Sequence, residues 1–166
     1  MKNITIKAIV IGIIAGLLVL LDKAIAGLLG QTGSFTWVAF VSWTVFYSST
    51  VKERLKAIVG YIIGFLAAVA IMKLGIVFSV IGALLGSILA TMIINFLCIE
   101  LENVQKYFPI SINGIFVGIA MTFSGLGVGL NINSIESSLM MLTIIVIYGI
   151  LGLLSGWLTL KFSPKN

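Results

Sequence analysis

The chain has 166 residues, of which 60% are hydrophobic and only 9% are charged, and its formal net charge is +5. So few polar residues cannot coat a water-soluble core of this size, which excludes a soluble globular protein. The composition predicts an all-α polytopic membrane protein, a single membrane domain over residues 1–166 whose surroundings are the lipid bilayer.

Six apolar segments follow one another with short links, and charged or glycine-rich links interrupt any arrangement of fewer, longer helices. A transmembrane helix needs about 20 mainly apolar residues. The predicted spans cover approximately residues 4–21, 35–49, 57–72, 76–97, 110–129 and 139–160, and the second is short. Residues 1–21 also resemble a signal peptide, but its removal would leave five spans and no partner for the first.

The basic residues alternate between the links rather than forming one polar face, which argues against nucleic acid as a partner. Lys23 and Lys73 are the only two in the first, third and fifth links. The positive-inside rule therefore predicts that both termini are cytoplasmic. The other eight lie in the N-terminal segment, the second and fourth links and the tail: Lys2, Lys7, Lys52, Arg54, Lys56, Lys106, Lys161 and Lys165.

Enzyme chemistry is not expected. The chain has no histidine, which removes the commonest general base and metal ligand, and a Ser–His–Asp triad cannot be assembled. Cys98 is the single cysteine, so no internal disulfide forms. No catalytic residue, metal or cofactor is predicted.

The acidic residues read as link or span-end residues, which gives little support to proton-coupled transport. Asp22 lies inside a span only if the first span continues through Leu29. A local pair with Lys23, or a simple span end, is the favoured interpretation. The five acids are Asp22, Glu53, Glu100, Glu102 and Glu136.

The two halves of the chain echo each other in the same order, which predicts a 3+3 inverted repeat with halves of about 1–75 and 76–166. Composition alone is the alternative explanation. The matching segments are Val10-Ile11-Gly12 with Val80-Ile81-Gly82, Phe40-Val41-Ser42 with Phe116-Val117-Gly118, and Gly64-Phe65-Leu66 with Gly152-Leu153-Leu154.

Glycine pairs spaced by four residues occur in five of the six spans. This spacing places both glycines on one helix face, where two backbones can approach closely, either within one bundle or between subunits. The predicted packing positions are Gly12 and Gly16, Gly60 and Gly64, Gly82 and Gly86, Gly114 and Gly118, and Gly152 and Gly156.

Spans two and five carry the most hydroxyl and aromatic residues, and they are predicted to line a solute path. Three glycines within five residues make the end of span five a poor helix, which indicates either a break beside a wet cavity or simply the helix end. The hydroxyls could instead bond to carbonyls of their own helix. The predicted path residues are Thr44, Tyr47, Ser48, Thr122, Phe123 and Ser124.

The segment from Phe116 to Gly127 reads F-x-G-x-x-x-T-F-x-G-x-G and resembles a run in the YcdZ-like family of small bacterial inner-membrane proteins of unknown function. Trp37, Phe40 and Thr44, followed by the basic link ending Leu55-Lys56, are similar to that family's second span. The family often has a Pro-Gln-Gly-Gly type link after this span, where this chain has residues 49–53. The resemblance implies a multi-pass protein of the bacterial inner membrane and supplies no substrate.

Two functions are compatible with these features. The first is a channel or facilitative transporter for a small solute that is neutral or weakly charged. The alternative is a non-transporting membrane protein that binds a partner protein or lipid through its glycine-rich helix faces. A homo-oligomer is expected in either case, because six helices with so many glycine faces leave surfaces to spare.

Overall fold

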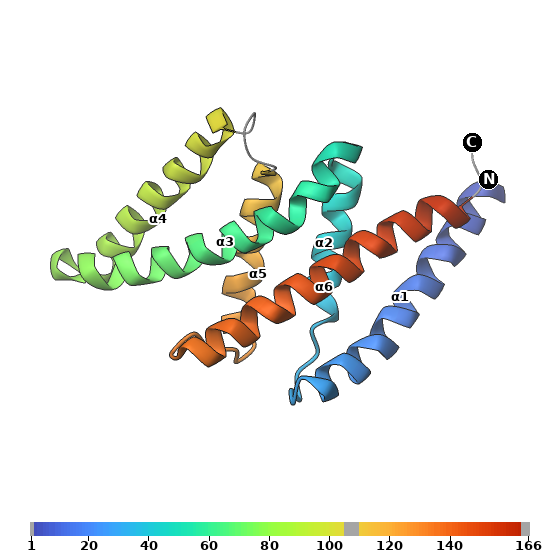
Figure 1. Ribbon diagram of the computed structural model, residues 1–166, viewed down its shortest axis with the longest axis horizontal. Coiled ribbons are helices and arrows are strands. Elements are labelled where there is room, and N and C mark those ends of the chain that lie inside the picture. Colours follow the sequence, from blue (N-terminus) through green and yellow to red (C-terminus); the bar gives the residue numbers. More distant parts are fainter. Residues whose placement is uncertain (1, 105–109, 164–166) are drawn as a thin grey trace.

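The computed structural model describes residues 2–104 and 110–163 (Figure 1). Within these residues all regular structure is helical, which confirms the predicted all-α class. The α-helices are α1 (Lys2–Leu28), α2 (Thr36–Ser48), α3 (Val51–Phe78), α4 (Ala83–Glu100), α5 (Ile112–Gly127) and α6 (Ile135–Phe162), and two 3₁₀ helices are η1 (Ser79–Ile81) and η2 (Leu101–Val104).

Among the described residues, four helices are long and apolar enough to cross a membrane, over Ile6–Leu28, Lys56–Ile81, Ala83–Glu100 and Ile135–Phe162, and α5 is a shorter apolar helix. The chain is therefore a multi-pass membrane protein. Helix α2 differs from the others because it has only 13 residues. At 1.5 Å per residue it is about 20 Å long, whereas the hydrocarbon core of a bilayer is about 30 Å thick.

Helices α3 and α6 run at a slant through the middle of the molecule, and α2 and α5 stand more steeply beside them (Figure 1). The main packing partners are α3 with α5, α2 with α6, and α3 with α4. Helix α1 flanks α6 and α2 on one side. The start of α1 lies close to the end of α6 at the upper right of this view.

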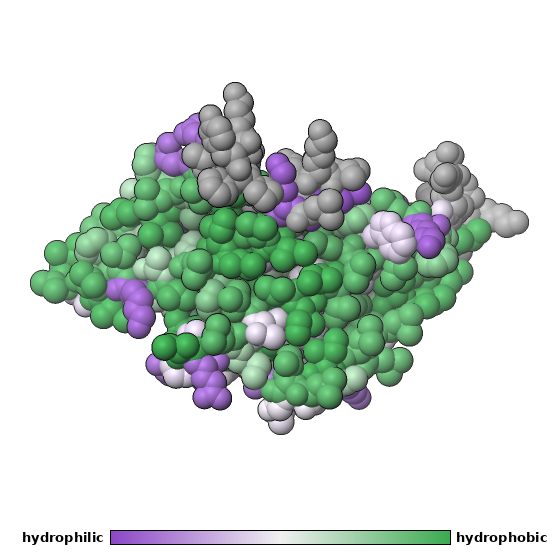
Figure 2. All heavy atoms as spheres, in the orientation of Figure 1, coloured by the Kyte–Doolittle hydropathy of each residue, from purple (hydrophilic) through white to green (hydrophobic). Residues whose placement is uncertain are grey.

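The outer surface is that of a protein in lipid. Figure 2 shows a broad hydrophobic band across the visible face, with hydrophilic residues gathered near its upper and lower edges. Large side chains such as Ile9, Leu20 and Leu84 are more than half exposed. Such a surface would aggregate in water but needs no cover in a bilayer.

The turns carry the local signals expected at helix ends. Gly82 has φ +110°, which only glycine adopts without strain, and it joins η1 to α4. Ser134 and Ser137 form a reciprocal capping box at the start of α6. Ser111 caps α5 by accepting a 3.2 Å hydrogen bond from the amide of Gly114.

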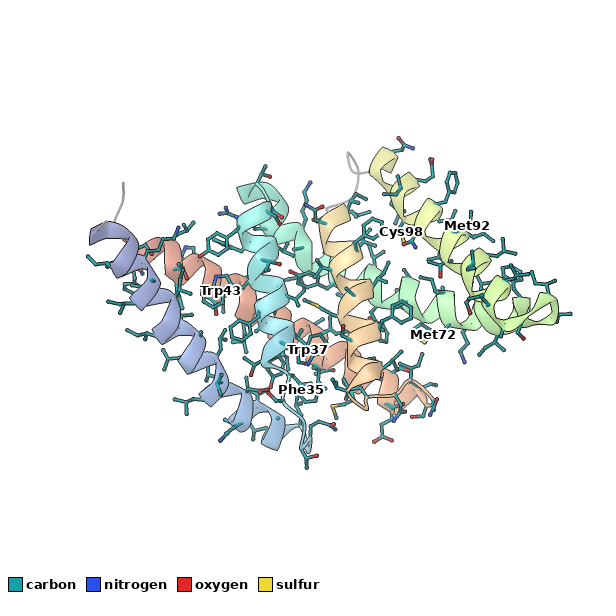
Figure 3. All side chains as sticks on the ribbon, turned by 180° about the vertical axis from the view of Figure 1, so that it is seen from behind. Phe35, Trp37, Trp43, Met72, Met92 and Cys98 are labelled. Atoms are coloured by element: carbon teal, nitrogen blue, oxygen red, sulfur yellow. The ribbon has the colours of Figure 1, made fainter. Side chains whose placement is uncertain are left out.

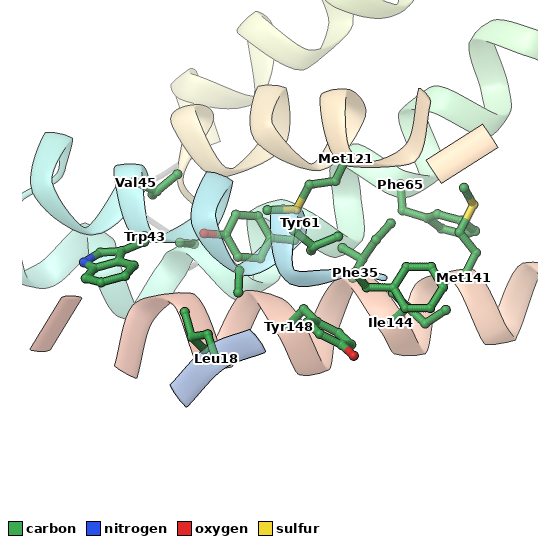
Figure 4. Packing of buried hydrophobic residues seen from close by; sticks show 14 of the residues in the cluster. Leu18, Phe35, Trp43, Val45, Tyr61, Phe65, Met121, Met141, Ile144 and Tyr148 are labelled. Carbon is green, nitrogen blue, oxygen red and sulfur yellow. The ribbon is translucent and has the colours of Figure 1, made fainter. Parts of the chain in front are cut away.

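The interior is built around two tyrosines from the long slanted helices. Tyr61 of α3 is fully buried, and Tyr148 of α6 is 1% exposed. In Figure 4 the ring of Tyr148 lies next to Phe35, and the two rings pack edge to face with centroids 5.9 Å apart. Met121 of α5 lies near Tyr61 in the same cluster. A second cluster joins α3, α4 and the start of α5 around Ile71, Cys98 and Ile115.

Candidate functional site

Asp22 is a buried carboxylate inside the first span. Helix α1 continues to Leu28, seven residues beyond the predicted span end at 21, so Asp22 is neither a link residue nor a span end. Its side chain is only 3% exposed. The favoured interpretation, a local pair with Lys23 or a simple span end, is therefore wrong. The break in hydropathy at Asp22 and Lys23 does not end the helix, because the carboxylate finds polar partners within the protein.

The partners of Asp22 are hydroxyl groups and a backbone amide rather than Lys23. Oδ2 accepts hydrogen bonds from Ser34 Oγ at 2.6 Å and Thr36 Oγ1 at 2.7 Å. The amide of Phe35 donates to Oδ1 at 3.0 Å and to Oδ2 at 3.2 Å. The Tyr148 hydroxyl donates to Oδ1 at 2.5 Å. These contacts join α1, the start of α2 and the middle of α6 at a single point.

Charges from other helices hold both ends of the short helix α2. Asp22 lies at its N-terminus, where the helix dipole favours an anion, and bonds the amide of the N-cap residue Phe35. At the other end, Arg54 Nε donates a 2.8 Å hydrogen bond to the carbonyl oxygen of Phe46. The Arg54 guanidinium also lies 4.0 Å from the centroid of the Phe46 ring. Helix α2 is therefore positioned by one charge from α1 and one from α3.

A polar contact lies in the middle of α2, where α2, α3 and α6 meet. Ser42 Oγ donates to the carbonyl oxygen of Gly149 at 2.6 Å and lies 2.8 Å from the Tyr61 hydroxyl. Because Ser42 donates its hydroxyl proton to the carbonyl oxygen of Gly149, the Tyr61 hydroxyl is the donor to Ser42. Ser42 and Tyr61 are completely buried. Such interhelical hydrogen bonds are a common means of joining helices in membranes.

Two indole N–H groups on α2 find no hydrogen-bond partner in the part of the chain that the structure describes. The Nε1 atoms of Trp37 and Trp43 are buried and unpaired among the described residues. Trp43 is 6% exposed and stacks on Phe40 with centroids 6.1 Å apart. Figure 3 shows Trp37 and Trp43 on this helix and Phe35 just before it. A buried donor left unpaired costs about 1–3 kcal/mol, so each group would gain from an acceptor.

Glycines make the two closest helix crossings. At the α3–α5 crossing, a Cβ on Gly60 would lie 2.8 Å from Gly114 Cα, and one on Gly64 would lie 2.8 Å from Gly118 Cα. At the α2–α6 crossing, a Cβ on Gly152 would lie 2.6 Å from Ser42 Cβ. Gly156 lies against the ring of Phe46 in the same crossing. Five of the predicted packing glycines therefore sit where backbones approach closely, and Gly156 leaves room for an aromatic side chain.

The other four predicted glycines differ. Gly12 and Gly16 are exposed on α1, with no atom within 4 Å of an added Cβ, so the described chain holds no packing partner for them. Gly82 also has no such neighbour, and its left-handed φ shows that the turn requires it rather than packing. Gly86 lies against the backbone of Phe78, at the end of the preceding helix.

The structure does not gather the six predicted path residues into the interior of one chain. Thr44, Tyr47 and Ser48 are on the exposed side of α2, and Phe123 and Ser124 are exposed on α5. Thr122 alone is buried. The hydroxyls of Thr44, Ser48 and Thr122 donate to carbonyls three or four residues earlier in their own helices, which is the alternative that the sequence left open.

Sequence reasoning overlooked the polar residues that the fold brings together. Tyr61 and Tyr148 look like ordinary apolar-span residues, and their partners are 19 and 126 residues away. Asp22 carried a usable signal, because an acid flanked by apolar runs on both sides is rare in a membrane helix and marks function by default. Within the described residues, no group of three or more His, Cys, Asp or Glu could hold a metal ion.

The helices and polar contacts define a multi-pass membrane protein with a short internal helix anchored by a buried carboxylate. The family described as "Protein of unknown function (DUF1097)" matches residues 8–163, and the chain belongs to this family. This agrees with the expected resemblance to membrane proteins of unknown function. No curated protein and no solved structure matches the chain.

Proposed function

We propose that the chain is a channel or facilitative transporter for a small solute that is neutral or weakly charged. The observation that carries this proposal is the pair of unpaired, buried indole N–H groups of Trp37 and Trp43 on α2. A path that opened beside α2 would let a solute with oxygen acceptors bond to these donors. Donors that are already desolvated bind such a solute without a further dehydration cost.

The packing of the helices supports an inverted repeat, the architecture of many channels and secondary transporters. In this repeat α2 corresponds to α5, and α3 corresponds to α6. The sequence matches align Gly64 with Gly152 and Ser42 with Gly118. The contact of Gly64 with Gly118 between α3 and α5 therefore has its counterpart in the contact of Gly152 with Ser42 between α6 and α2. The major pair α3 with α5 likewise becomes α6 with α2.

Asp22 has a positioning role in this proposal. Membrane-embedded acids commonly lie on ion and substrate paths. Here the carboxylate is occupied by donors from Ser34, Phe35, Thr36 and Tyr148, and it holds the N-terminal end of α2. The solute would therefore pass along α2 rather than bind to the carboxylate.

The six path residues predicted from the sequence remain part of the proposal in a modified arrangement. Thr44, Tyr47 and Ser48 are on the outer side of α2, so they would line a path only where a second copy of the chain covers them. Phe123 and Ser124 would do the same on α5, whereas Thr122 is buried within the chain and would reach a path only if α5 moved. The YcdZ-like resemblance and the eight-to-two basic bias extend the proposal to a bacterial inner membrane with both termini cytoplasmic.

Osmotic swelling of liposomes tests transport directly. Wild-type protein is reconstituted, and light scattering follows the entry of glycerol, erythritol, urea and glycine as probes. At least one probe should enter faster than into protein-free liposomes. Trp37→Phe and Trp43→Phe keep an aromatic ring and remove the indole N–H, so each should slow that entry.

Trp157→Phe is the matched control, because Trp157 is half exposed on α6 and packs against Lys161. Its entry rates should equal those of the wild type. If no probe enters faster than in protein-free liposomes, the transport proposal fails. If transport occurs but neither variant on α2 slows it, the indole groups are not on the path.

The exposed pair Gly12 and Gly16 favours a second candidate, a non-transporting protein that associates through α1. Two glycines spaced by four on a lipid-facing surface allow another helix to approach closely. Gly12→Leu with Gly16→Leu should then abolish association with a partner protein or lipid while the fold persists. If the double variant still admits the solute and still binds its partners, this second function is excluded.

A further inference from the structure

We propose that the groove between the first half of α3 and the second half of α6 binds one anionic glycerophospholipid. The phosphate would lie at Arg54, and one acyl chain would run along the apolar walls. The groove has a volume of about 520 Å³. Its walls are Ile58 of α3 and Ile150, Leu154 and Trp157 of α6, and Phe46 of α2 lies beside them.

Arg54 is the one charged residue among the described residues that line this groove. Its Nε atom bonds the Phe46 carbonyl at 2.8 Å, and its guanidinium lies 4.0 Å from the Phe46 ring centroid. These two contacts fix the plane of the group while its terminal amino groups have no hydrogen-bond partner among the described residues. A fixed guanidinium fork matches two oxygens of a phosphate.

A second positive charge lies near the same groove. Lys161 Nζ is 4.8 Å from the ring centroid of Trp157, which is 49% exposed. Figure 1 shows that the start of α3 and the end of α6 both reach the upper edge of the molecule. Aromatic and basic side chains are typical of the headgroup level of a membrane.

Charge and shape together select the occupant. Two cations at one end favour a headgroup with net negative charge over a zwitterionic one. The long apolar walls of Ile58, Ile150 and Leu154 would give a free phosphate ion nothing to contact. An acyl chain attached to the phosphate fits both parts of the groove, and the bilayer presents it at the correct depth.

Native mass spectrometry of the full chain in detergent tests this site with phosphatidylglycerol and phosphatidylcholine of identical acyl chains. Wild-type protein should retain phosphatidylglycerol more strongly. R54Q should weaken phosphatidylglycerol binding about five-fold, as expected for one basic residue at an anionic headgroup. Phosphatidylcholine carries the same phosphate but no net charge, so its binding should weaken less. K161Q should have a smaller effect in the same direction, because Lys161 contacts Trp157 rather than lining the groove.

Lys73→Gln is the matched control, since Lys73 is an exposed basic residue toward the other end of α3. It should leave both lipids unaffected. Because Arg54 also holds the end of α2, a second variant keeps Arg54 intact: L154W narrows the groove at a half-exposed position and should weaken phosphatidylglycerol binding. Equal retention of the two lipids by the wild type, or unchanged retention in both R54Q and L154W, would overturn the proposal.

Fluorescence gives an independent measurement. Dibrominated phosphatidylglycerol in nanodiscs should quench the emission contributed by Trp157 more than dibrominated phosphatidylcholine at the same mole fraction. The contribution of Trp157 is obtained by comparison with W157F. Excess inorganic phosphate should not reverse the quenching. Reversal by phosphate would show a free-anion site and contradict a lipid occupant.

Discussion

The Tyr148 hydroxyl donates a 2.5 Å hydrogen bond to the carboxylate of Asp22, although 126 residues separate the two in the chain. The same hydroxyl lies 3.3 Å from the Asp22 backbone oxygen. One residue of the last helix thereby contacts both a side chain and the backbone of the first. The contact closes the bundle around α2, whose N-cap residue Phe35 bonds the same carboxylate.

Tyr148→Phe and Asp22→Asn should both destabilise the protein, by different amounts. The phenylalanine variant removes one hydrogen bond to a charged group, which is worth about 1.5–3 kcal/mol. The asparagine variant disturbs every donor around the carboxylate and should cost more. Thermal unfolding in detergent measures both. Equal melting temperatures for Asp22→Asn and the wild type would show that these bonds do not hold α1 in place.

Gly64→Ala should be strongly destabilising, whereas Gly12→Ala should not. An added Cβ at Gly64 meets the backbones of Ile115, Gly118 and Ile119, which cannot move aside singly. The expected loss is about 1–3 kcal/mol, the usual cost of overpacking. Gly12 is a matched control on an exposed helix face, where alanine is the better helix former. Melting temperatures of the two variants give the comparison. Similar losses of stability in both would contradict the close crossing of α3 and α5.

A double-mutant cycle of Ser42→Ala and Tyr61→Phe should show coupling. The two hydroxyls lie 2.8 Å apart and are completely buried. Interhelical hydrogen bonds in membranes average about 0.6 kcal/mol and reach about 1.7 kcal/mol, and the coupling should fall in that range. Unfolding free energies of the two single variants and the double variant give the value. A coupling of zero would mean that Gly149 alone satisfies Ser42.

The topology prediction is tested by reporter fusions. A reporter fused after Asn166 should be active only in its cytoplasmic form, because eight of the ten basic residues lie in the segments assigned to that side. A fusion truncated at Gln31, between α1 and α2, should be active only in its periplasmic form. Periplasmic activity at Asn166 would contradict the orientation or the number of spans.

Composition and the six apolar runs were sufficient for the class and the six helices, because burial in lipid requires long apolar segments whatever the packing. The close crossings at Gly60, Gly64, Gly114 and Gly118 were also foreseeable, since spacing by four places small residues on one helix face. Which of these glycine pairs contacts another helix depends on how the helices pack, and the sequence does not show this. The exposed pair on α1 has the same spacing as the buried pairs.

The polar contacts were not foreseeable, because they depend on distant partners. Hydroxyl and aromatic residues lie on several sides of span two, so its sequence does not show that Ser42 faces inward while Thr44 faces outward. The extent of α1 was missed for a similar reason. A charge pair at residues 22 and 23 resembles a span end until Ser34, Phe35 and Thr36 are known to return to it.

The burial of Asp22 also constrains how the chain enters the membrane. An aspartate in a lone membrane helix raises the free energy of insertion, by about 2.5–3.5 kcal/mol at the helix centre and by less nearer an end, where Asp22 lies, and α1 emerges from the ribosome before its partners. The earliest donors are on Ser34, Phe35 and Thr36, only 12 to 14 residues later. We therefore expect α1 and α2 to leave the translocon together as a hairpin, with the carboxylate already shielded. Tyr148 is made last, and its arrival completes a contact that began when less than a quarter of the protein had been synthesised.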